Sequence, residues 1–409
     1  MSRIGGVMVS EDRLTSVAIC GAGIAGLALA IRLTEMGYKP VVFEARSEAA
    51  ASREGVFLTL APNGANGLRA IGCYDVVKKN GVYTTGIEIL NAKGKRLALA
   101  DQSDHEREFG APSITIRRGL LAEILLAKAR AVGANVRFDA RVTGVSTSPR
   151  GVRLALSGGV MHDSDILVAA DGLRSSIREM VFSDYPKPHY TGLIGTGGIT
   201  EAEIPHTGGL MRMTFGSKAF FGYVKSAGQP VYWFDSYAAD ESKIEKISDP
   251  VAYAREIRVL HANDPSPNAE ILDHVEVIER CYPIYDMPAL PCWHKGRVVL
   301  MGDAAHAVGP HAGQGASMAM EDALVLAACL EAEQDHETAF RRYEKLRRDR
   351  IELVVRITAR NSSQKRANGW FSLLIRDLVL PFVIPLGIQT ARKFFQFRAD
   401  YTPLVQPEF

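Results

Sequence analysis

The pattern of apolar and polar positions is strongest first at 16–46. An apolar run at 17–20 meets a glycine-rich turn, a helical pattern follows and ends at Gly37, and a second apolar run at 40–43 stops at Glu44. Short apolar runs bounded by turn residues predict buried strands, and helical periodicity predicts an amphipathic helix. The segment therefore predicts a strand, a turn, a helix and a second strand, in that order.

The turn of this segment carries glycines in the spacing G-x-G-x-x-G, at Gly21, Gly23 and Gly26. Such glycines allow a tight turn, a close approach of a pyrophosphate, and packing of the helix on the strand. The first helical turn, which contains Ala25, offers unpaired N–H groups and a favourable dipole to phosphates. Glu44, 18 residues after Gly26, is placed to accept hydrogen bonds from ribose hydroxyls. We therefore predict a dinucleotide site, and this fingerprint alone leaves NAD(P) and FAD open.

Two later segments repeat the pattern of a strand followed by a polar turn and a helix. The apolar run at 166–170 is followed by Asp-Gly at 171–172, and the run at 298–301 is followed by Gly-Asp at 302–303. The second of these leads into a helical pattern at about 315–330. Open α/β sheets bind ligands at the carboxyl ends of their strands. These polar turns therefore indicate a ligand-facing edge.

The middle of the chain, at 186–285, follows a different pattern. Apolar and polar residues alternate there, with aromatic and β-branched enrichment, which predicts antiparallel strands and a second, sheet-based domain. We take Arg212, Tyr223 and Trp233 as candidates for a substrate pocket, although side chains alternate between the two faces of a strand.

Composition and charge narrow the possible partners. The 409 residues, 47% hydrophobic and 23% charged, suffice for two or three domain-sized units, and no run reaches the roughly 18 apolar residues of a membrane span. A net charge of +2 gives no strong field toward nucleic acid or an anionic surface. Composition and charge therefore favour a small-molecule partner only by default, because they indicate no other class of partner.

The cysteines and the N-terminus bear on the compartment. The five cysteines are odd in number, widely spread and without C-x-x-C spacing, so they predict no disulfide framework and no metal centre. Residues 1–16 contain no apolar core or cleavage site of a secretion signal, and we expect a short disordered leader. A cytoplasmic location follows as the expectation.

Together the three segments resemble the flavoprotein aromatic monooxygenases of the p-hydroxybenzoate hydroxylase type, the group A flavoprotein hydroxylases. The family carries a glycine fingerprint near the N-terminus, a middle Asp-Gly motif and a late Gly-Asp motif, and this chain shows all three in that order. Segment 116–120 is similar to the family's R-x-x-L helix start. Further matches are at 52–55, 61–64, 282–286 and Trp293. The likeness covers roughly residues 16–350.

The resemblance implies an α/β fold: a Rossmann-type FAD-binding domain, an inserted and mostly antiparallel β-sheet substrate domain, and C-terminal helices. A hairpin at 86–99 is implied to join the inserted sheet. The expected boundaries are 14–80, 101–185 and 286–360 for the discontinuous FAD-binding domain, 81–100 and 186–285 for the substrate domain, and 361–409 for the C-terminal helices.

The resemblance also implies that FAD is the tightly held dinucleotide. It places Glu44 on the adenosine ribose, Arg53 and Arg117 along the cofactor, and Asp303 on the ribityl and pyrophosphate region. Asp171 belongs to a motif linked to both FAD and NAD(P)H, whereas surface charge is the alternative for the two arginines. The full set expected to bind the cofactor is Gly21, Gly23, Ala25, Gly26, Glu44, Arg46, Arg53, Arg117, Asp171, Gly302, Asp303, Pro310, Gly313, Gly315 and Ala316.

The loop before the last predicted helix is the candidate for contact with the flavin ring. Gly313 and Gly315 let the N–H groups of the helix start reach a ligand, and the N1–C2=O edge of a reduced flavin is negative. Pro310 and His311 come immediately before, where the family's loop passes the ring, so they are the candidate catalytic positions. For His306 we expect a packing role.

The activity implied by the resemblance is hydroxylation of an aromatic or heteroaromatic small molecule. NADPH or NADH reduces FAD at N5, O2 adds at C4a, and the resulting hydroperoxide transfers one oxygen to the substrate ring. No second glycine fingerprint lies on a strand-helix junction, so NAD(P)H is expected to visit transiently. An FAD-dependent epoxidase or dehydrogenase and a flavin-binding protein without turnover remain alternatives, as do monomer and homodimer.

The C-terminal part departs from these patterns. Residues 340–366 contain ten Arg or Lys against three acids, and the apolar stretch at 370–397 is broken by Pro381 and Pro385. Binding to a membrane surface is conceivable, but we favour helices packed on the FAD-binding domain or on a second subunit.

Overall fold

The computed structural model describes residues 16–52, 55–242, 248–309, 313–365 and 392–400, together with Pro381 and Leu404. Within 358–365 it describes the backbone only. The expected leader, most of the predicted C-terminal helices, and Arg53, Pro310 and His311 lie outside these residues.

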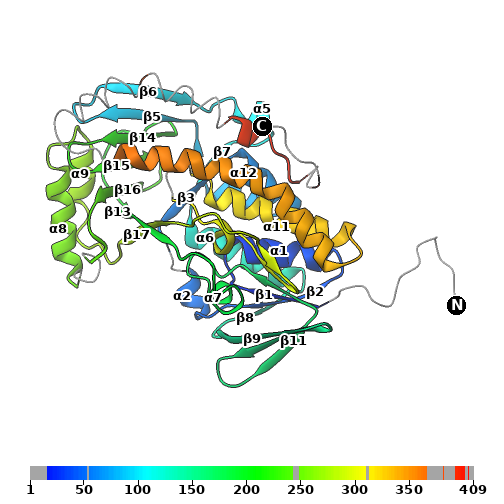
Figure 1. Ribbon diagram of the computed structural model, residues 1–409. Coiled ribbons are helices and arrows are strands. Elements are labelled where there is room, and N and C mark those ends of the chain that lie inside the picture. Colours follow the sequence, from blue (N-terminus) through cyan, green and yellow to red (C-terminus); the bar gives the residue numbers. More distant parts are fainter. Residues whose placement is uncertain are drawn as a thin grey trace.

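A six-stranded sheet forms the centre of the part that the resemblance assigns to FAD binding, here called the FAD-binding part (Figure 1). Its strands, in spatial order, are β18 (His294–Lys295), β19 (Val298–Leu300), β12 (Ile166–Ala169), β1 (Ser16–Cys20), β2 (Lys39–Phe43) and β8 (Asn135–Arg137). All neighbours are parallel except the edge pair β18 and β19. In register, Cys20 is aligned with Ala169, which is aligned with Leu300. The three turns predicted to face a ligand therefore leave the sheet side by side.

Helices cover this sheet because their apolar faces are rich in small residues. The helices α1 (Ile24–Glu35) and α11 (Gly315–Ala332) pack on each other, and α12 (His336–Lys365) crosses α11 on its outer side (Figure 1). A Cβ atom on Gly302 would touch the methyl groups of Ala25 and Ala319 at 3.4 and 3.8 Å. The Gly302 turn is thus wedged between the starts of the two inner helices.

A seven-stranded sheet forms the second part of the molecule. Its order is β17 (Tyr282–Asp286), β13 (His189–Thr200), β16 (Val231–Ala238), β15 (Phe220–Lys225), β14 (Leu210–Phe215), β5 (Gly86–Asn91) and β6 (Arg96–Asp101). Every pair is antiparallel except β14 with β5. Helices α8 (Pro250–His261) and α9 (Asn268–Asp273) cover one face (Figure 1). The strands of the hairpin predicted at 86–99 pair within this sheet.

The remaining elements connect the two parts or decorate them. Two antiparallel three-stranded sheets consist of β9 (Val142–Ser148), β10 (Gly151–Leu156) and β11 (Met161–Ser164), and of β3 (Phe57–Leu60), β7 (Ser113–Arg117) and β4 (Val82–Thr84). The other helices are α2 (Glu48–Ser52), α3 (Pro62–Ala70), α4 (Tyr74–Asn80), α5 (His105–Phe109), α6 (Arg118–Ala131), α7 (Ser176–Val181) and α10 (Asp303–His306).

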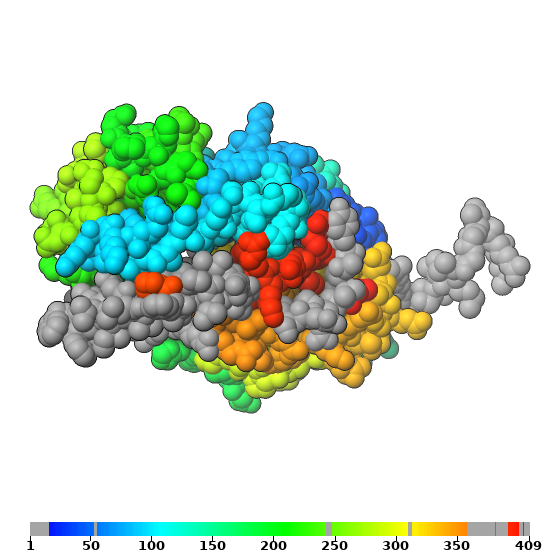
Figure 2. All heavy atoms as spheres, turned by 90° about the horizontal axis from the view of Figure 1, so that it is seen from above, coloured from blue at the N-terminus to red at the C-terminus, as the bar shows by residue number. Residues whose placement is uncertain are grey.

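The basic C-terminal region is partly a core feature. Arg347 and Arg350 of α12 are fully buried, and both pair with Glu321 of α11 at 2.5–2.7 Å. Figure 2 shows residues 392–400 lying against the α5 region, where Phe395 meets Phe109 with ring centres 5.6 Å apart. Among the described residues, no helix is both long and apolar enough to cross a membrane. Part of the basic run therefore neutralises buried acids on α11.

Candidate active site

The first two turns at the sheet edge touch through backbone, and glycine is required there. Gly21 has a φ of +102°, and a Cβ atom on it would lie 2.3 Å from the carbonyl oxygen of Ala170. A Cβ atom on Gly26 would lie 2.0 Å from the carbonyl oxygen of Gly21. Side chains at these positions would push β1, α1 and β12 apart. Two of the three fingerprint glycines are therefore explained by packing within the protein.

The third fingerprint glycine faces open space. Gly23 is the N-cap residue of α1, and a Cβ atom on it would meet no atom of the described residues within 4 Å. The same holds for Gly313, whose φ is +62°, and for Gly315 at the start of α11. Two helix N-termini therefore present bare backbone to the same edge of the sheet, which suits an elongated ligand with anionic groups.

Glu44 connects the glycine turn to the end of β2. Its Oε2 accepts a hydrogen bond from the N–H of Ala22 at 3.0 Å, and its Oε1 accepts two from Arg46 at 2.8 and 3.0 Å. Burial raises the pKa of Glu44, but these hydrogen bonds outweigh burial and lower the pKa below its usual value. The carboxylate is ionised, and Oε2 keeps one acceptor position for a ribose hydroxyl.

Asp171 turns the chain after β12 and also caps α7. Its Oδ2 accepts hydrogen bonds from the N–H of Ile177 at 3.1 Å and from Ser176 at 3.4 Å. Ser175 is the N-cap residue of α7. Among the described residues, the buried Oδ1 of Asp171 has no hydrogen-bond partner. Burial accordingly raises the pKa of this carboxyl, and Oδ1 is free to accept a donor from a ligand.

Arg178 holds the second and third turns together. It is 3% exposed and donates to the carbonyl oxygens of Leu173 and Ala304, both at 2.7 Å. This guanidinium is therefore a structural link between the turn after β12 and the turn after β19.

Asp303 begins α10 and points away from the packed core. Its side chain is exposed, yet the surrounding protein raises its pKa, while the charges of His306 and Arg118 act in the opposite direction. A carboxylate that is both accessible and flanked by protein lies in a recess. Arg118, the first residue of α6, is the positive charge on this recess.

A buried carboxylate fixes the backbone of this third turn. Asp322 accepts the N–H of Gly302 at 3.0 Å, the Nε2 of His306 at 2.6 Å and the Nε of Arg347 at 2.6 Å. Burial raises the pKa of Asp322, but the positive charges and hydrogen bonds of His306 and Arg347 lower it to about 2. His306 thus has the packing role expected of it, 7% exposed and paired with Asp322.

The start of α11 is fixed to the segment 61–64. Ser317 accepts a hydrogen bond from the N–H of Ala61 at 3.2 Å, and Asn63 donates to the side chain of Gln314 at 3.2 Å. A Cβ atom on Gly64 would lie 2.5 Å from the hydroxyl oxygen of Ser317. The bare helix start at Gly313 and Gly315 is therefore held rigidly from behind.

The sheet places the three pocket candidates on its helix-covered face. Arg212 forms an ion pair with Glu88 at 2.8 Å and a hydrogen bond with Tyr223 at 3.4 Å. Tyr223 and Trp233 are 2% and 1% exposed in the cluster that packs against α8 and α9. That Arg212 and Tyr223 line the substrate pocket stays a prediction, and the two side chains share the face of the sheet that carries α8 and α9. Trp233 borders a cavity of about 430 Å³ beside β13, which Gly55 and Val56 also line.

The opposite face of this sheet is apolar and lies toward the FAD-binding part. Tyr232, Phe234 and Met211 lie on it, and Phe57 of β3 meets it from the FAD-binding part. The ring of Phe57 makes edge contacts with Tyr232 and Phe234, with centres 5.5 and 5.9 Å apart. These residues form a wall of aromatic and thioether side chains, which we call the aromatic wall.

Sequence reasoning missed Arg118 and the aromatic wall. The motif R-x-x-L occurs twice in overlapping positions, starting at Arg117 or at Arg118. The first ends on Leu120, which is only half-buried, and the second ends on Leu121, which is fully buried. That difference in burial would have selected Arg118. Arg117 ends β7, its Cα is paired with Phe57, and its charge reaches Tyr232 instead.

These features fit FAD. The bare backbone at Gly23, Gly313 and Gly315, the free acceptor of Asp171 and the recess at Asp303 form one line along the edge where three parallel strands end. Pyrophosphate and ribityl groups require this alternation of N–H donors and carboxylate acceptors.

Comparison with known proteins agrees with the geometry. A family model described as "FAD binding domain" matches residues 14–358, most of the chain, so the chain belongs to this family. Its class is that of FAD-dependent aromatic monooxygenases, the flavoprotein hydroxylases, with FAD as cofactor and NAD(P)H as the co-substrate typical of the family.

Two curated relatives cover nearly the whole chain. An aurachin C monooxygenase/isomerase of Stigmatella aurantiaca is 32% identical over 338 residues, which is 82% of this chain and 85% of the relative. A 6-hydroxynicotinate 3-monooxygenase of Bordetella bronchiseptica is 29% identical, covering 85% of this chain and 91% of the relative.

A solved structure shares the fold. Klebsiella pneumoniae HpxO complexed with FAD and uric acid is similar with a TM-score of 0.81 at 22% identity, covering 92% of this chain and 97% of that one. The fold is therefore that of the FAD-binding hydroxylases.

Proposed function

We propose that this protein uses FAD, NAD(P)H and O2 to hydroxylate an aromatic or heteroaromatic small molecule held against the aromatic wall. The observation that carries the proposal is the position of β3. Its first residue, Phe57, belongs to the aromatic wall, and the residue after its end, Ala61, is hydrogen-bonded to Ser317 in the first turn of α11.

The length of β3 supports this arrangement. Four extended residues span roughly 13 Å, which separates the aromatic wall from the bare start of α11. A flavin ring at Gly313 and Gly315 and a substrate ring at Phe57, Tyr232 and Phe234 fit within that span. Aromatic side chains pair favourably with an aromatic substrate and exclude water.

We assign each cofactor-facing residue a role in binding. The backbone N–H groups at Gly23, at the start of α1, donate hydrogen bonds to the pyrophosphate, and Glu44 accepts one from a ribose hydroxyl. Asp303 and Arg118 bind the ribityl and pyrophosphate region from opposite sides, and Gly313 and Gly315 donate to the N1–C2=O edge of the ring. The flavin, when bound, supplies the hydride and oxygen-transfer chemistry, and the protein orients the substrate and keeps the site dry.

Arg117 supplies a charge for substrate selection. Burial raises the pKa of Tyr232, and the charge of Arg117 partly offsets that rise, so the guanidinium lies close to the aromatic wall. A substrate with an acidic hydroxyl or carboxylate would be favoured there. We expect Arg117→Gln to raise KM more for such substrates than for neutral analogues.

Five free cysteines support a further proposal, a reducing compartment such as the cytoplasm.

The test of the proposed function is direct turnover. The purified protein is expected to be yellow, and NADPH and NADH oxidation is measured with a panel of phenols and N-heteroaromatics, followed by mass analysis of products. Substrate-stimulated oxidation with a gain of one oxygen atom supports the proposal. Epoxides or desaturated products would show that the protein is an epoxidase or a dehydrogenase instead of a hydroxylase. A colourless protein that FAD does not reconstitute would overturn the cofactor assignment.

A further inference from the structure

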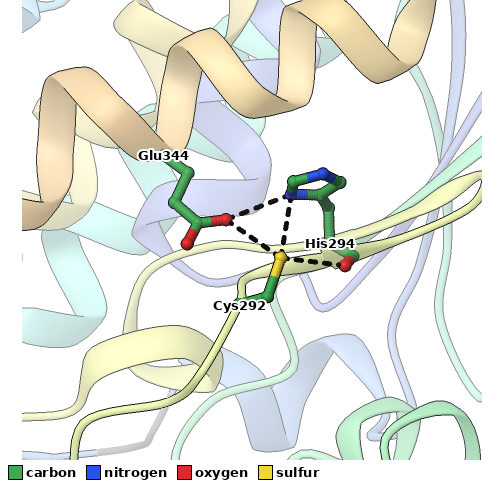
Figure 3. Close-up of side chains that lie close together, drawn as sticks. All are labelled: Cys292, His294 and Glu344. Carbon is green, nitrogen blue, oxygen red and sulfur yellow. Dashed lines mark hydrogen bonds and ion pairs between the residues drawn. The ribbon is translucent and has the colours of Figure 1, made fainter.

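Three side chains that bind metal ions in other proteins meet outside the proposed FAD site. Cys292 and His294 lie at the start of the hairpin formed by β18 and β19, here called the edge hairpin, and Glu344 reaches them from α12 (Figure 3). The spacing C-x-H in extended chain directs both side chains to the same side. All three residues are partly buried.

Their ligand atoms form a compact triangle. The Sγ of Cys292 is 3.3 Å from the Nδ1 of His294 and 3.3 Å from the Oε2 of Glu344, and Nδ1 is 3.1 Å from Oε2. A tetrahedral ion with bonds of about 2.0–2.3 Å holds such atoms about 3.3–3.6 Å apart. The triangle needs to widen by only a few tenths of an ångström to receive one.

Protons do not satisfy all three contacts. The S–H group can point to Oε2 or to the carbonyl oxygen of His294, which is 3.2 Å from Sγ, and an N–H on Nδ1 can serve the contact to Oε2. The contact from Sγ to Nδ1 is then left without a hydrogen of its own. An ion at the centre of the triangle would satisfy all three atoms together.

The glutamate is prepared for this role. Its Oε2 accepts the N–H of Trp293 at 2.9 Å, and its Oε1 is held by Arg348, so the carboxylate is oriented with Oε2 toward the triangle. Both oxygens of the carboxylate are thus fixed by contacts with groups outside the triangle.

We propose that Cys292, His294 and Glu344 form a structural site for a borderline divalent cation of the Zn²⁺ class. Binding breaks the S–H bond of Cys292 and releases its proton to solvent, while the proton on Nδ1 of His294 is replaced by one on Nε2. Bonds then form from the ion to Sγ, Nδ1 and Oε2, with water in the fourth position. No electron is transferred. Thiolate and imidazole ligands select Zn²⁺ over Mg²⁺ or Ca²⁺, which prefer oxygen.

The site joins two elements behind the Gly302 turn. Trp293, between the two hairpin ligands, packs on His306 with ring centres 5.1 Å apart, and His306 is paired with Asp322. The ion fixes the edge hairpin to α12 and so stabilises the third turn from the rear. This role does not depend on the proposed oxygenation.

Metal titration of the full-length, FAD-loaded protein tests the proposal. The protein is treated with a chelator, dialysed and titrated with Zn²⁺ against a chromophoric competitor, and then with Co²⁺, whose tetrahedral ligand-field bands lie in the red. We expect one Zn²⁺ per chain, tetrahedral Co²⁺ bands with a thiolate charge-transfer band, and a higher Tm with Zn²⁺.

The variants are chosen so that each result either supports or overturns the proposed metal site. Cys292→Ser is expected to weaken Zn²⁺ binding by about 100-fold and Glu344→Gln by about tenfold, because even losses outside the ligand shell cost about 10- to 100-fold. Cys281→Ser, which removes another partly buried thiol, is the control and is expected to bind as the wild type does. If Cys292→Ser fails to fold, Zn²⁺ binding by Glu344→Gln tests the proposed site instead. Absence of stoichiometric Zn²⁺ on the wild type, or undiminished binding by a folded Cys292→Ser or by Glu344→Gln, would overturn the site.

Discussion

The cofactor edge is the sheet edge where β1, β12 and β19 end, together with the starts of α1 and α11. It lies near one end of β3 and the aromatic wall near the other, but the two regions are built by different means. At the cofactor edge, backbone does the positioning: Gly21 and Gly26 allow contacts that any Cβ atom would prevent, and Gly23 leaves a helix start bare. At the aromatic wall, side chains do the positioning, and Tyr232 differs from its neighbour Trp233 only in the face of the strand it occupies.

This difference means that the two regions should fail differently when mutated. A change at the cofactor edge alters the path of the chain and removes the flavin. A change on the sheet alters either stability or substrate binding, depending on which face the residue occupies.

The largest effect is expected from Gly26→Ala. Its methyl group would lie 2.0 Å from the carbonyl oxygen of Gly21, so α1 must move away from β1. We expect a loss of about 3 kcal/mol or more in the free energy of unfolding and loss of bound flavin. Gly144→Ala is the control, because its methyl group would make an ordinary contact at 3.4 Å. Flavin retained at full occupancy by Gly26→Ala, measured by absorbance, would contradict the packing account.

Next in size is the contrast between the two faces of β16. Trp233→Ala should cost about 3–5 kcal/mol of stability, since the indole is 1% exposed and stacks on Phe221 with ring centres 6.0 Å apart. Phe234→Ala should cost less stability and raise the KM for the aromatic substrate by about tenfold. Denaturant unfolding and steady-state kinetics measure the two effects. A reversed pattern would place the substrate on the other face.

The helix-covered side of the seven-stranded sheet, opposite the aromatic wall, and the cofactor edge should also respond oppositely to pH. His261 is fully buried between Asp235 and Asp264, at 3.5 and 2.7 Å. Burial lowers the pKa of His261, but the two aspartates outweigh burial and raise it to about 9. Its stabilisation is therefore complete below the unfolded pKa of about 6.5 and is lost as pH rises through about 9, at a cost of about 2 kcal/mol between pH 7 and 9.

Asp322 has the opposite sign, because its pKa is lowered to about 2. Its stabilisation is present above the unfolded pKa of about 3.9 and is lost as pH falls toward 2. Denaturant unfolding at several pH values measures both effects, with His261→Gln as the comparison. An equal alkaline loss in His261→Gln would remove the assignment to His261.

The smallest effect is expected from single cofactor side chains. Arg118→Ala and Asp303→Ala should each weaken FAD binding by about tenfold, because each removes one charge-assisted contact while the backbone donors remain. Arg117→Ala should leave FAD binding nearly unchanged. Flavin titration of the apoprotein measures all three. Undiminished FAD occupancy in Asp303→Ala would count against the role given to Asp303.

The sequence predicted the cofactor edge well because its signal is local. The apolar run, the glycine spacing and the acid at Glu44 lie within one segment, and the strand at 166–170 and the helix from Gly315 were expected within one or two residues. Each turn had a physical requirement that few other residues satisfy.

The other features of the site could not be predicted because they depend on how elements distant in the sequence pack together. Strand alternation states which residues share a face but not which face meets the FAD-binding part. It could therefore not separate Arg212 and Tyr223 on one face from Tyr232 and Phe234 on the other. The adjacent Arg117 and Arg118 differ by one residue of register at a strand-helix junction. The pairing of Arg347 with Asp322 joins residues 25 positions apart on two helices.

The central claim is that FAD bound at the cofactor edge delivers one atom of O2 to an aromatic ring at the aromatic wall. The most direct measurement is turnover of the FAD-loaded protein under heavy-isotope O2, with NADPH or NADH and an accepted aromatic substrate, followed by mass analysis. We predict that the product carries one heavy oxygen atom, and that Phe234→Ala, at a substrate concentration well below KM, forms about tenfold less of this product while it still retains FAD. A product whose new oxygen comes from water, or an oxidised product without a new oxygen, would contradict the claim.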